Sequence, residues 1–326
     1  MAEQARLLGS ARVAVAAAAD SELLRAIGMA QAEKLIKPVL VGDVPLIEKY
    51  AAEIGLNLSE AELIHESDAV AAAQRAVDAV VDGQADFLMK GLVNSSDFLR
   101  AVLRPERGLR TGRLLSHLAA FQTPNYHKLL FVTDGGMNIA PDLKQKKEIL
   151  TNTLNYLHNI GMDAINVIAL TANEAVNPKM PATVDAQALS EMGEAGEFPG
   201  AVVEGPLALD CAVSAAALRH KGLESKVNGN VDVLLVPTIE VGNALGKSLI
   251  YFGGATMAGI ILGAKVPIVL TSRSDTPAGK LMALVMASLS RMNQSRAASS
   301  APAEGETADK SGNGRDNGSK PGAVAR

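Results

Sequence analysis

Ser272, Arg273 and Asp275 stand within four positions of each other, shortly after the apolar run Val-Pro-Ile-Val-Leu. A hydroxyl and a guanidinium can bind an anion, and a neighbouring carboxylate can take up a proton. If the apolar run is a parallel strand, these side chains lie just past its carboxyl end, where open α/β sheets bind ligands. The same segment can also cap a helix, with Asp275 or Thr276 as the cap and Pro277 in the first turn. We predict a site that binds an anion and moves a proton.

A second set of candidate binding residues comprises Asn243, Lys247 and Asp210, which also follow apolar runs. The stretch from Gly242 to Ser248 is similar to a P-loop, but three rather than four residues separate its glycines, which disfavours nucleotide hydrolysis. We expect a turn at Gly242 and Asn243 and then a helix with Lys247 near its first turn. The amino terminus of such a helix can still bind a phosphate group.

A basic region after residues 86–89 includes Arg100, which we predict to bind substrate. Four more arginines follow within residues 104–113 and could hold phosphate groups, although a solvated basic face is the simpler interpretation for Arg107 and Arg110. The segment Asp134-Gly135-Gly136 follows another apolar run and is either a ligand loop or an ordinary turn.

The composition excludes several classes of protein. The net charge is −4 and only 3% of the residues are aromatic, with no Trp, so a nucleic-acid partner is not expected. No apolar run is long enough to cross a membrane, and the amino-terminal segment lacks a signal-peptide pattern. The single cysteine, Cys211, favours a reducing cytoplasm, and the five histidines show no metal-ligand spacing. We therefore predict a cytoplasmic protein with no bound metal.

Short apolar runs alternate with longer amphipathic segments along the chain. The runs predict strands at 12–18, 38–41, 86–89, 128–133, 164–170, 201–204, 232–236 and 266–270. The amphipathic segments predict helices at 20–35, 67–81, 143–159, 185–192 and 207–219, the first of them capped by Asp20. Several runs lack polar alternation, as expected for strands covered on both faces. The order of elements predicts an α/β fold with mainly parallel sheets.

The chain of 326 residues is long enough for two domains. We predict that residues 1–130 and 265–292 form a first α/β domain and that residues 131–264 form a second. From Asn293 the sequence is rich in Ser, Ala, Gly and Pro and has almost no large apolar residue. Residues 293–326 are therefore predicted to be a disordered tail.

Three blocks of sequence resemble the phosphate acetyl/butyryltransferase family, and the likeness extends over about residues 10–292. The blocks are NPKMPATVDA from Asn177, EGPLALDCAVS from Glu204, and the long segment from Val233 to Asp275 that begins VLLVPTIEVGNALGKS. They are closer to the butyryl branch of the family than to its acetyl enzymes.

The resemblance implies a reversible reaction in which acyl-CoA and phosphate give an acyl phosphate and CoA, with a short acyl group such as acetyl or butyryl. It implies two domains of the isocitrate/isopropylmalate dehydrogenase-like architecture, an active site in the cleft between them, and a homodimer or larger assembly. CoA and acyl-CoA are substrates, and no further cofactor is implied.

The family's catalytic serine and arginine correspond to Ser272 and Arg273, and the phosphate-binding arginine of its first domain corresponds best to Arg100. The catalytic aspartate of the acetyl enzymes lies several residues further past the arginine. In this chain the only carboxylate between Ser274 and Gly279 is that of Asp275, which we take as the candidate general base.

Two alternatives of other classes stay open. A decarboxylating dehydrogenase of the same architecture would need NAD and a divalent metal, but no G-x-G-x-x-G follows the first strand and no aspartate cluster surrounds Asp275. A non-catalytic module that binds CoA or phosphate would need no general base.

Overall fold

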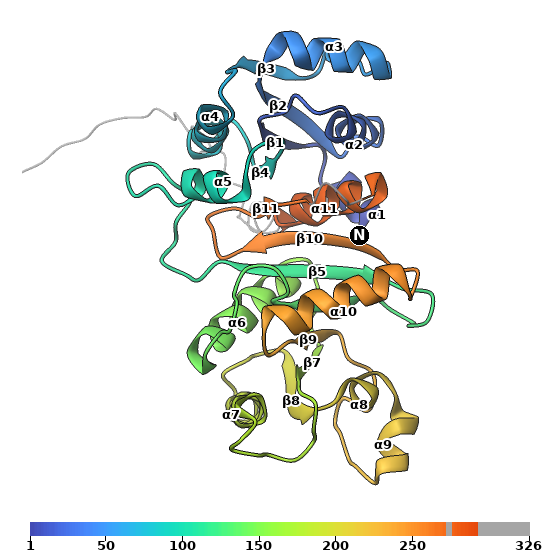
Figure 1. Ribbon diagram of the computed structural model, residues 1–326. Helices are drawn as coiled ribbons and strands as arrows, with labels where there is room; N and C mark the ends of the chain where they lie inside the picture. Colours follow the sequence, from blue (N-terminus) through green and yellow to red (C-terminus); the bar gives the residue numbers. More distant parts are fainter. Residues whose placement is uncertain (272–275, 293–326) are drawn as a thin grey trace, which may run out of the picture.

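The computed structural model describes residues 1–271 and 276–292, in which one eleven-stranded sheet carries helices on both faces (Figure 1). The strands are β1 (Ala11–Ala16), β2 (Ile36–Gly42), β3 (Glu62–His65), β4 (Phe87–Lys90), β5 (Ser116–Gln122), β6 (Leu130–Thr133), β7 (Ile165–Leu170), β8 (Ala201–Leu207), β9 (Val233–Leu235), β10 (Thr256–Leu262) and β11 (Ile268–Val269). The helices are α1 (Ala2–Leu7), α2 (Ser21–Ala32), α3 (Val44–Ile54), α4 (Ala69–Val81), α5 (Ser95–Val102), α6 (Leu143–Asn159), α7 (Pro181–Glu194), α8 (Leu209–Val213), α9 (Ala215–Lys221), α10 (Ile239–Tyr251) and α11 (Pro277–Leu289). None of the described helices is long and apolar enough to cross a membrane.

The strand order is β3-β2-β1-β4-β11-β10-β5-β6-β9-β7-β8. Within the described sheet the pairs β11–β10, β10–β5 and β5–β6 are antiparallel, and the other neighbouring pairs are parallel. The predicted α/β fold with a mainly parallel sheet is therefore confirmed. The last segment of the chain lies beside the first strands, because β11 pairs with β4 and α11 packs on α2.

The side chains of each strand alternate between two apolar layers, as the two-residue period of a strand requires. In β1, Val13 and Val15 belong to the layer of α1, α2, α6 and α11, whereas Ala14 and Ala16 belong to the layer of α4 and α5. The first layer is continuous along the sheet. The opposite face has two separate layers, one under α4 and α5 and one under α8, α9 and α10.

The structure corrects several boundaries. Strands β3, β5 and β10 were not predicted, because short segments with alanine, glycine and polar residues carry a weak strand signal. The predicted helix 207–219 is two helices, which separate where Ser214 caps α9 through its Oγ and the backbone N–H of Ala217, at 3.2 Å.

The predicted turn at Gly242 and Asn243 is wrong. Helix α10 already begins at Ile239, after Thr238 at its N-cap position, so both residues lie inside the helix. Lys247 is accordingly in the third turn of α10 and not near the amino terminus. Pro237 ends the preceding extended segment, and Glu240 is the acidic residue in the first turn, which together explain the earlier start.

Candidate active site

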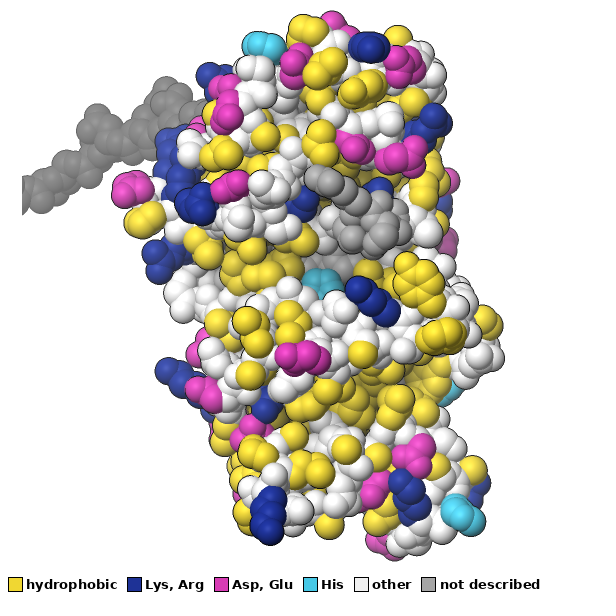
Figure 2. Space-filling view, in the orientation of Figure 1, with side chains coloured by type: hydrophobic (Ala, Val, Ile, Leu, Met, Phe, Trp, Pro, Cys, Tyr) yellow, Lys and Arg dark blue, Asp and Glu magenta, His cyan; other side chains and the backbone are white. Residues whose placement is uncertain are grey.

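A cavity of about 440 Å³ lies where the helical layer on the second face is interrupted. Strands β5, β6 and β10 form its floor, α10 and the loop after β6 form one side, and Leu270 and Thr276 complete the wall. Figure 2 shows this face hollowed across its middle, with hydrophobic side chains above and below the hollow. The residues that follow the carboxyl ends of β6 and β11 line the cavity. The cavity therefore lies at the edge of the sheet where α/β proteins bind ligands.

Two other cavities are larger but less suited to the predicted chemistry. One of about 580 Å³ lies between α2, the segment that follows α3 and Pro277 of α11, among Leu24, Met29 and Leu56. The other, of about 660 Å³, includes Asp86 and Pro267, which precede β4 and β11, so it lies at the opposite edge of the parallel strands. Position at the carboxyl edge therefore favours the cavity beside α10.

The loop after β6 is held in place by a buried carboxylate. Asp134 is 2% exposed, and its Oδ1 accepts hydrogen bonds from the backbone N–H groups of Gly136 and Met137, both at 2.8 Å. Its Oδ2 accepts from the side chain of Asn138 at 2.6 Å and from the backbone N–H of His117 at 3.1 Å. With four donors, Asp134 orders the glycine loop beside the cavity, so the predicted turn is also part of the cavity wall.

Helix α10 reaches the cavity through a close contact between two glycines. A Cβ atom added to Gly242 would lie 2.6 Å from the Cα atom of Gly135, and one added to Gly135 would lie 2.9 Å from the carbonyl carbon of Gly242. Only glycine permits this approach of helix to loop. Asn243 and Lys247, on the same helix, thereby lie on the cavity wall with exposed side chains.

His117 is a cavity residue that sequence reasoning did not single out. It projects from β5 between two glycines, so that a Cβ atom at Gly259 would lie 2.6 Å from its Nε2 and one at Gly136 would lie 3.0 Å from its Cγ. These contacts fix the orientation of the imidazole on the cavity wall. The histidine was missed because β5 itself was missed; a strand prediction there would have placed it beside the glycine loop.

The charge of the cavity wall suits an anion. Among the described residues that line it, Lys247 contributes a cation, and none is an aspartate or glutamate. Ser272, Arg273 and Asp275 lie outside the described residues. Leu270 and Thr276, which flank them in the sequence, both line the cavity.

Arg100 does not line this cavity. It lies on α5, its side chain is 72% exposed, and its Nη1 makes an ion pair with Oδ1 of Asp97 at 2.6 Å. The arginines that follow it are also engaged in the structure, since Arg104 and Arg107 both pair with Asp78 of α4. The predicted role of Arg100 in substrate binding stays a prediction.

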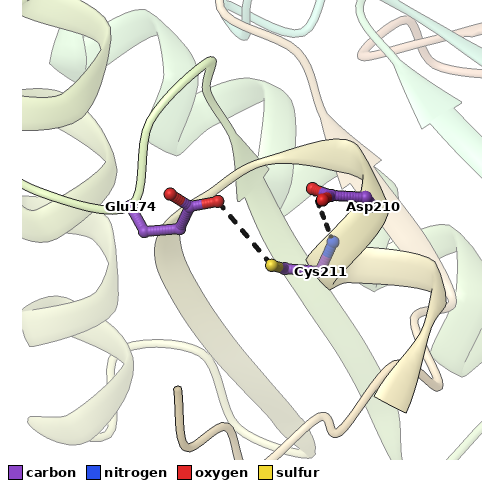
Figure 3. Close-up of side chains that lie close together, drawn as sticks. All are labelled: Glu174, Asp210 and Cys211. Atoms are coloured by element: carbon purple, nitrogen blue, oxygen red, sulfur yellow. Dashed lines mark hydrogen bonds between the residues drawn. The ribbon is translucent and has the colours of Figure 1, made fainter. Parts of the chain in front are cut away.

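Asp210 is not on the cavity wall either. Figure 3 shows it at the start of α8, next to Cys211 and close to Glu174 from the loop after β7. The ammonium group of Lys221 bridges the two carboxylates, at 2.7 Å from Glu174 and 2.9 Å from Asp210. This contact lowers the pKa of both carboxyl groups, whereas burial raises the pKa of the Cys211 thiol.

The atoms of Glu174, Asp210 and Cys211 that could bind a metal lie within 4.8 Å of one another. Sequence analysis missed this cluster because it considered histidine spacing. Lys221 already supplies a positive charge to both carboxylates, and the thiol of Cys211 donates to Glu174 at 3.6 Å. The cluster is therefore a satisfied ion-pair network that holds α8 and α9 against the loop after β7. The absence of a bound metal stays a prediction.

A family model, similar sequences and a similar solved structure all indicate the same class of protein. The family described as "Phosphate acetyl/butaryl transferase" matches residues 66–288. A phosphate butyryltransferase of Clostridium acetobutylicum is 43% identical over 278 residues, which cover 85% of this chain and 92% of that protein. A phosphate acetyltransferase of Rickettsia felis is 39% identical over 85% of this chain and 80% of its own length. The crystal structure of a branched-chain phosphotransacylase from Enterococcus faecalis has a TM-score of 0.76 at 35% identity and covers 86% of this chain and 98% of that one.

Proposed function

The chain belongs to the phosphate acetyl/butyryltransferase family, and from that premise we propose that its reaction takes place in the cavity beside α10. The enzyme is a phosphate acyltransferase, which transfers an acyl group reversibly between CoA and inorganic phosphate. The composition of the cavity wall supports this location. The wall includes Lys247 and a glycine loop, has no carboxylate among its described residues, and includes Leu270 and Thr276, which lie on either side of segment 272–275 in the sequence.

In the proposed mechanism Asp275 takes the proton of the CoA thiol, whose free pKa is about 8.5, like that of cysteine. The thiolate sulfur forms a bond to the carbonyl carbon of the acyl phosphate, and the bond from that carbon to the phosphate oxygen then breaks. Phosphate leaves with the electron pair. Arg273 and Ser272 stabilise the oxyanion and the departing phosphate. Because the site holds both substrates in line for reaction, their orientation lowers the activation free energy.

The acyl group is proposed to be short, acetyl or butyryl. The cavity wall contributes apolar side chains, among them Phe121, Ile250 and Met257, which suit an aliphatic chain. The similar proteins include both a butyryltransferase and an acetyltransferase.

An assay of CoA release tests reaction class and acyl length together. We expect thiol release from acetyl-CoA, propionyl-CoA or butyryl-CoA that requires added inorganic phosphate. Thiol release that is independent of phosphate, or none at all, would contradict the proposed function. Reduction of NAD by a hydroxy acid would favour the dehydrogenase alternative, and CoA binding without turnover would favour the non-catalytic module.

We propose that the cavity is the cleft between the two predicted domains. The cavity wall includes residues of both predicted domains. His117 and Thr276 belong to the first, residues 1–130 and 265–292, and Gly135 and Gly242 belong to the second, residues 131–264. This convergence supports the isocitrate/isopropylmalate dehydrogenase-like arrangement that the family resemblance implies. A crystal structure with CoA bound away from this cavity would contradict the assignment.

The predicted homodimer or larger assembly is also a proposal, as is the cytoplasmic location. Tyr251 and Phe252, at the end of α10, are 74% and 91% exposed, and Tyr251 also lines the cavity. Large aromatic side chains are enriched at protein interfaces, so these two support an assembly. A solution mass equal to that of one chain would argue against it. Recovery of the protein in a membrane or periplasmic fraction would argue against the cytoplasm.

Lys247 is expected to bind a phosphate group of CoA at the rim of the cavity. The Lys247→Met variant should raise the KM for acyl-CoA about tenfold and change kcat little, because the contact is made equally before and during reaction. The matched control is Lys144→Met, which removes an exposed lysine from α6. Steady-state kinetics with each substrate varied provides the measurement, and an unchanged KM for acyl-CoA would exclude this role.

A further inference from the structure

The cavity beside α10 extends along β5, and its two ends differ in chemistry. Its wall includes His117 and Phe121, which lie on one face of β5 and are separated by about 13 Å, at about 3.3 Å per residue. His117 lies at the glycine loop after β6, where its backbone N–H donates to Oδ2 of Asp134 at 3.1 Å. Phe121 lies at the other end, directly opposite Met257 of β10.

Helix α10 runs alongside β5 in the same direction (Figure 1). Gly242 contacts the glycine loop, and Gly246, one turn later, contacts Phe121, because a Cβ atom added to Gly246 would lie 3.0 Å from Cζ of the ring. Ile250 follows after another turn and lines the cavity. Residues four positions apart share a helix face, so these three positions of α10 all face the strands. Since Gly246 has no side chain, the ring of Phe121 occupies the space between helix and sheet.

The end of the cavity at the glycine loop is polar, whereas the end at Phe121 is mainly apolar. The polar end has the imidazole of His117 and lies beside Asn243. The apolar end is lined by Phe121, Ile250 and Met257, which belong to the apolar layer under α8, α9 and α10. A cavity of this kind suits a ligand with a polar head and a short aliphatic chain.

The ring of Phe121 limits the length of the cavity at its apolar end. Phe121 is only 1% exposed, and its ring lies between Gly246 of α10 and the neighbouring strand β10. A smaller side chain at position 121 would therefore add room to the cavity. A methyl group at position 246, which also lines the cavity, would remove room from the same end.

We propose that the acyl chain of the substrate lies at this apolar end and that Phe121, held against Gly246, sets the longest chain that the enzyme accepts. The inference rests on the proposed function and adds a specificity-determining residue to it. Acyl-CoA and acyl phosphate both carry the acyl chain, so Phe121 acts in both directions of the reaction. CoA also has methylene groups of its own. Contact with those groups would affect every acyl-CoA equally, whereas contact with the acyl chain distinguishes one chain length from another.

The test compares Phe121→Leu with Phe131→Leu. Phe131 lies on the neighbouring strand β6 and is 2% exposed, but its side chain belongs to the apolar layer on the opposite face of the sheet. For Phe121→Leu, kcat/KM for hexanoyl-CoA relative to acetyl-CoA should rise about tenfold or more, with the KM for phosphate within about threefold of the unaltered value. For Phe131→Leu the Tm should fall, because a buried ring is shortened, and the acyl preference should stay within about twofold.

Gly246→Ala should shift the preference in the opposite direction. The added Cβ fills part of the apolar end and displaces the ring of Phe121, so kcat/KM for butyryl-CoA relative to acetyl-CoA should fall about tenfold. Both shifts should recur when the acyl phosphates of the same chain lengths react with CoA. If Phe121→Leu does not fold, the preference of Gly246→Ala decides the question.

Three results would overturn the inference. One is an acyl preference that stays unaltered in Phe121→Leu or, if that variant does not fold, in Gly246→Ala. Another is an equal shift in Phe131→Leu, which would indicate general loosening of the core. The third is an effect seen with acyl-CoA but not with acyl phosphates, which would assign Phe121 to CoA.

Failure of the proposed function is distinguishable from failure of this inference. The unaltered protein is assayed first, and its phosphate-dependent release of CoA tests the function alone. If that activity is present, the acyl preferences of the variants test only the role of Phe121.

Discussion

An Asp275→Asn variant is expected to lose about 10²- to 10⁴-fold in kcat, while the KM values for acyl phosphate and CoA change little. Asparagine has nearly the shape of aspartate but cannot take up the thiol proton, so substrate contacts persist and proton transfer is lost. Steady-state kinetics in the direction that consumes CoA measures the effect. Full activity of the variant at neutral pH would remove Asp275 as the general base.

The pH dependence of this variant gives an independent check. Below the thiol pKa of about 8.5, CoA is mostly protonated and the variant lacks a base, so it is slow. Above that pKa the thiolate forms without help, and the rate of the variant should rise relative to that of the unaltered enzyme. The control is Asp43→Asn, because Asp43 caps α3 through a 3.2 Å bond from the N–H of Leu46, and asparagine caps equally well.

Replacing Gly242 by alanine is expected to lower the free energy of unfolding by about 1–3 kcal/mol and kcat/KM by about tenfold or more. Alanine in a helix interior is normally favoured over glycine by up to about 1 kcal/mol. Here the added Cβ would lie 2.6 Å from the Cα atom of Gly135, and neither backbone can rotate away. Helix α10 must shift, and Asn243 and Lys247 move with it.

Gly28→Ala is the matched control for this prediction. Gly28 is also inside a helix, α2, but an added Cβ would meet the flexible end of a side chain, at 2.9 Å from Cδ1 of Leu56. Leu56 can change rotamer, so the expected change in unfolding free energy is below about 1 kcal/mol, with activity unchanged. Denaturant unfolding and kinetics of both variants provide the measurement. Equal behaviour of the two would show that the contact between Gly242 and Gly135 does not position α10.

The antiparallel pair β5 and β10 accounts for how the cavity forms. These two strands lie in the middle of the sheet, between the strands that α4 and α5 cover and those that α8, α9 and α10 cover. Since no described helix covers the second face fully at this position, the side chains of His117, Phe121 and Met257 stay accessible to a ligand. The hollow in the middle of Figure 2 corresponds to this interruption.

Local signals in the sequence were sufficient to predict many of the helices and strands. Helix α6 spans Leu143–Asn159 as predicted, Asp20 caps α2 with its side chain, and Thr276 caps α11 ahead of Pro277. Each of these features depends on residues within a few positions of each other, namely a periodic apolar face, an oxygen acceptor and a proline in the first turn. The family, and with it the reaction, was also evident from contiguous blocks of sequence.

Only the tertiary structure decided which of the candidate residues share a site. It places Asn243 and Lys247 on one cavity wall with His117, pairs Arg100 with Asp97, and pairs Asp210 with Lys221. Burial and contact between residues distant in the chain depend on how the strands are ordered in the sheet, and no local pattern encodes that order. The sequence therefore determined the reaction and most of the elements, and packing determined the site.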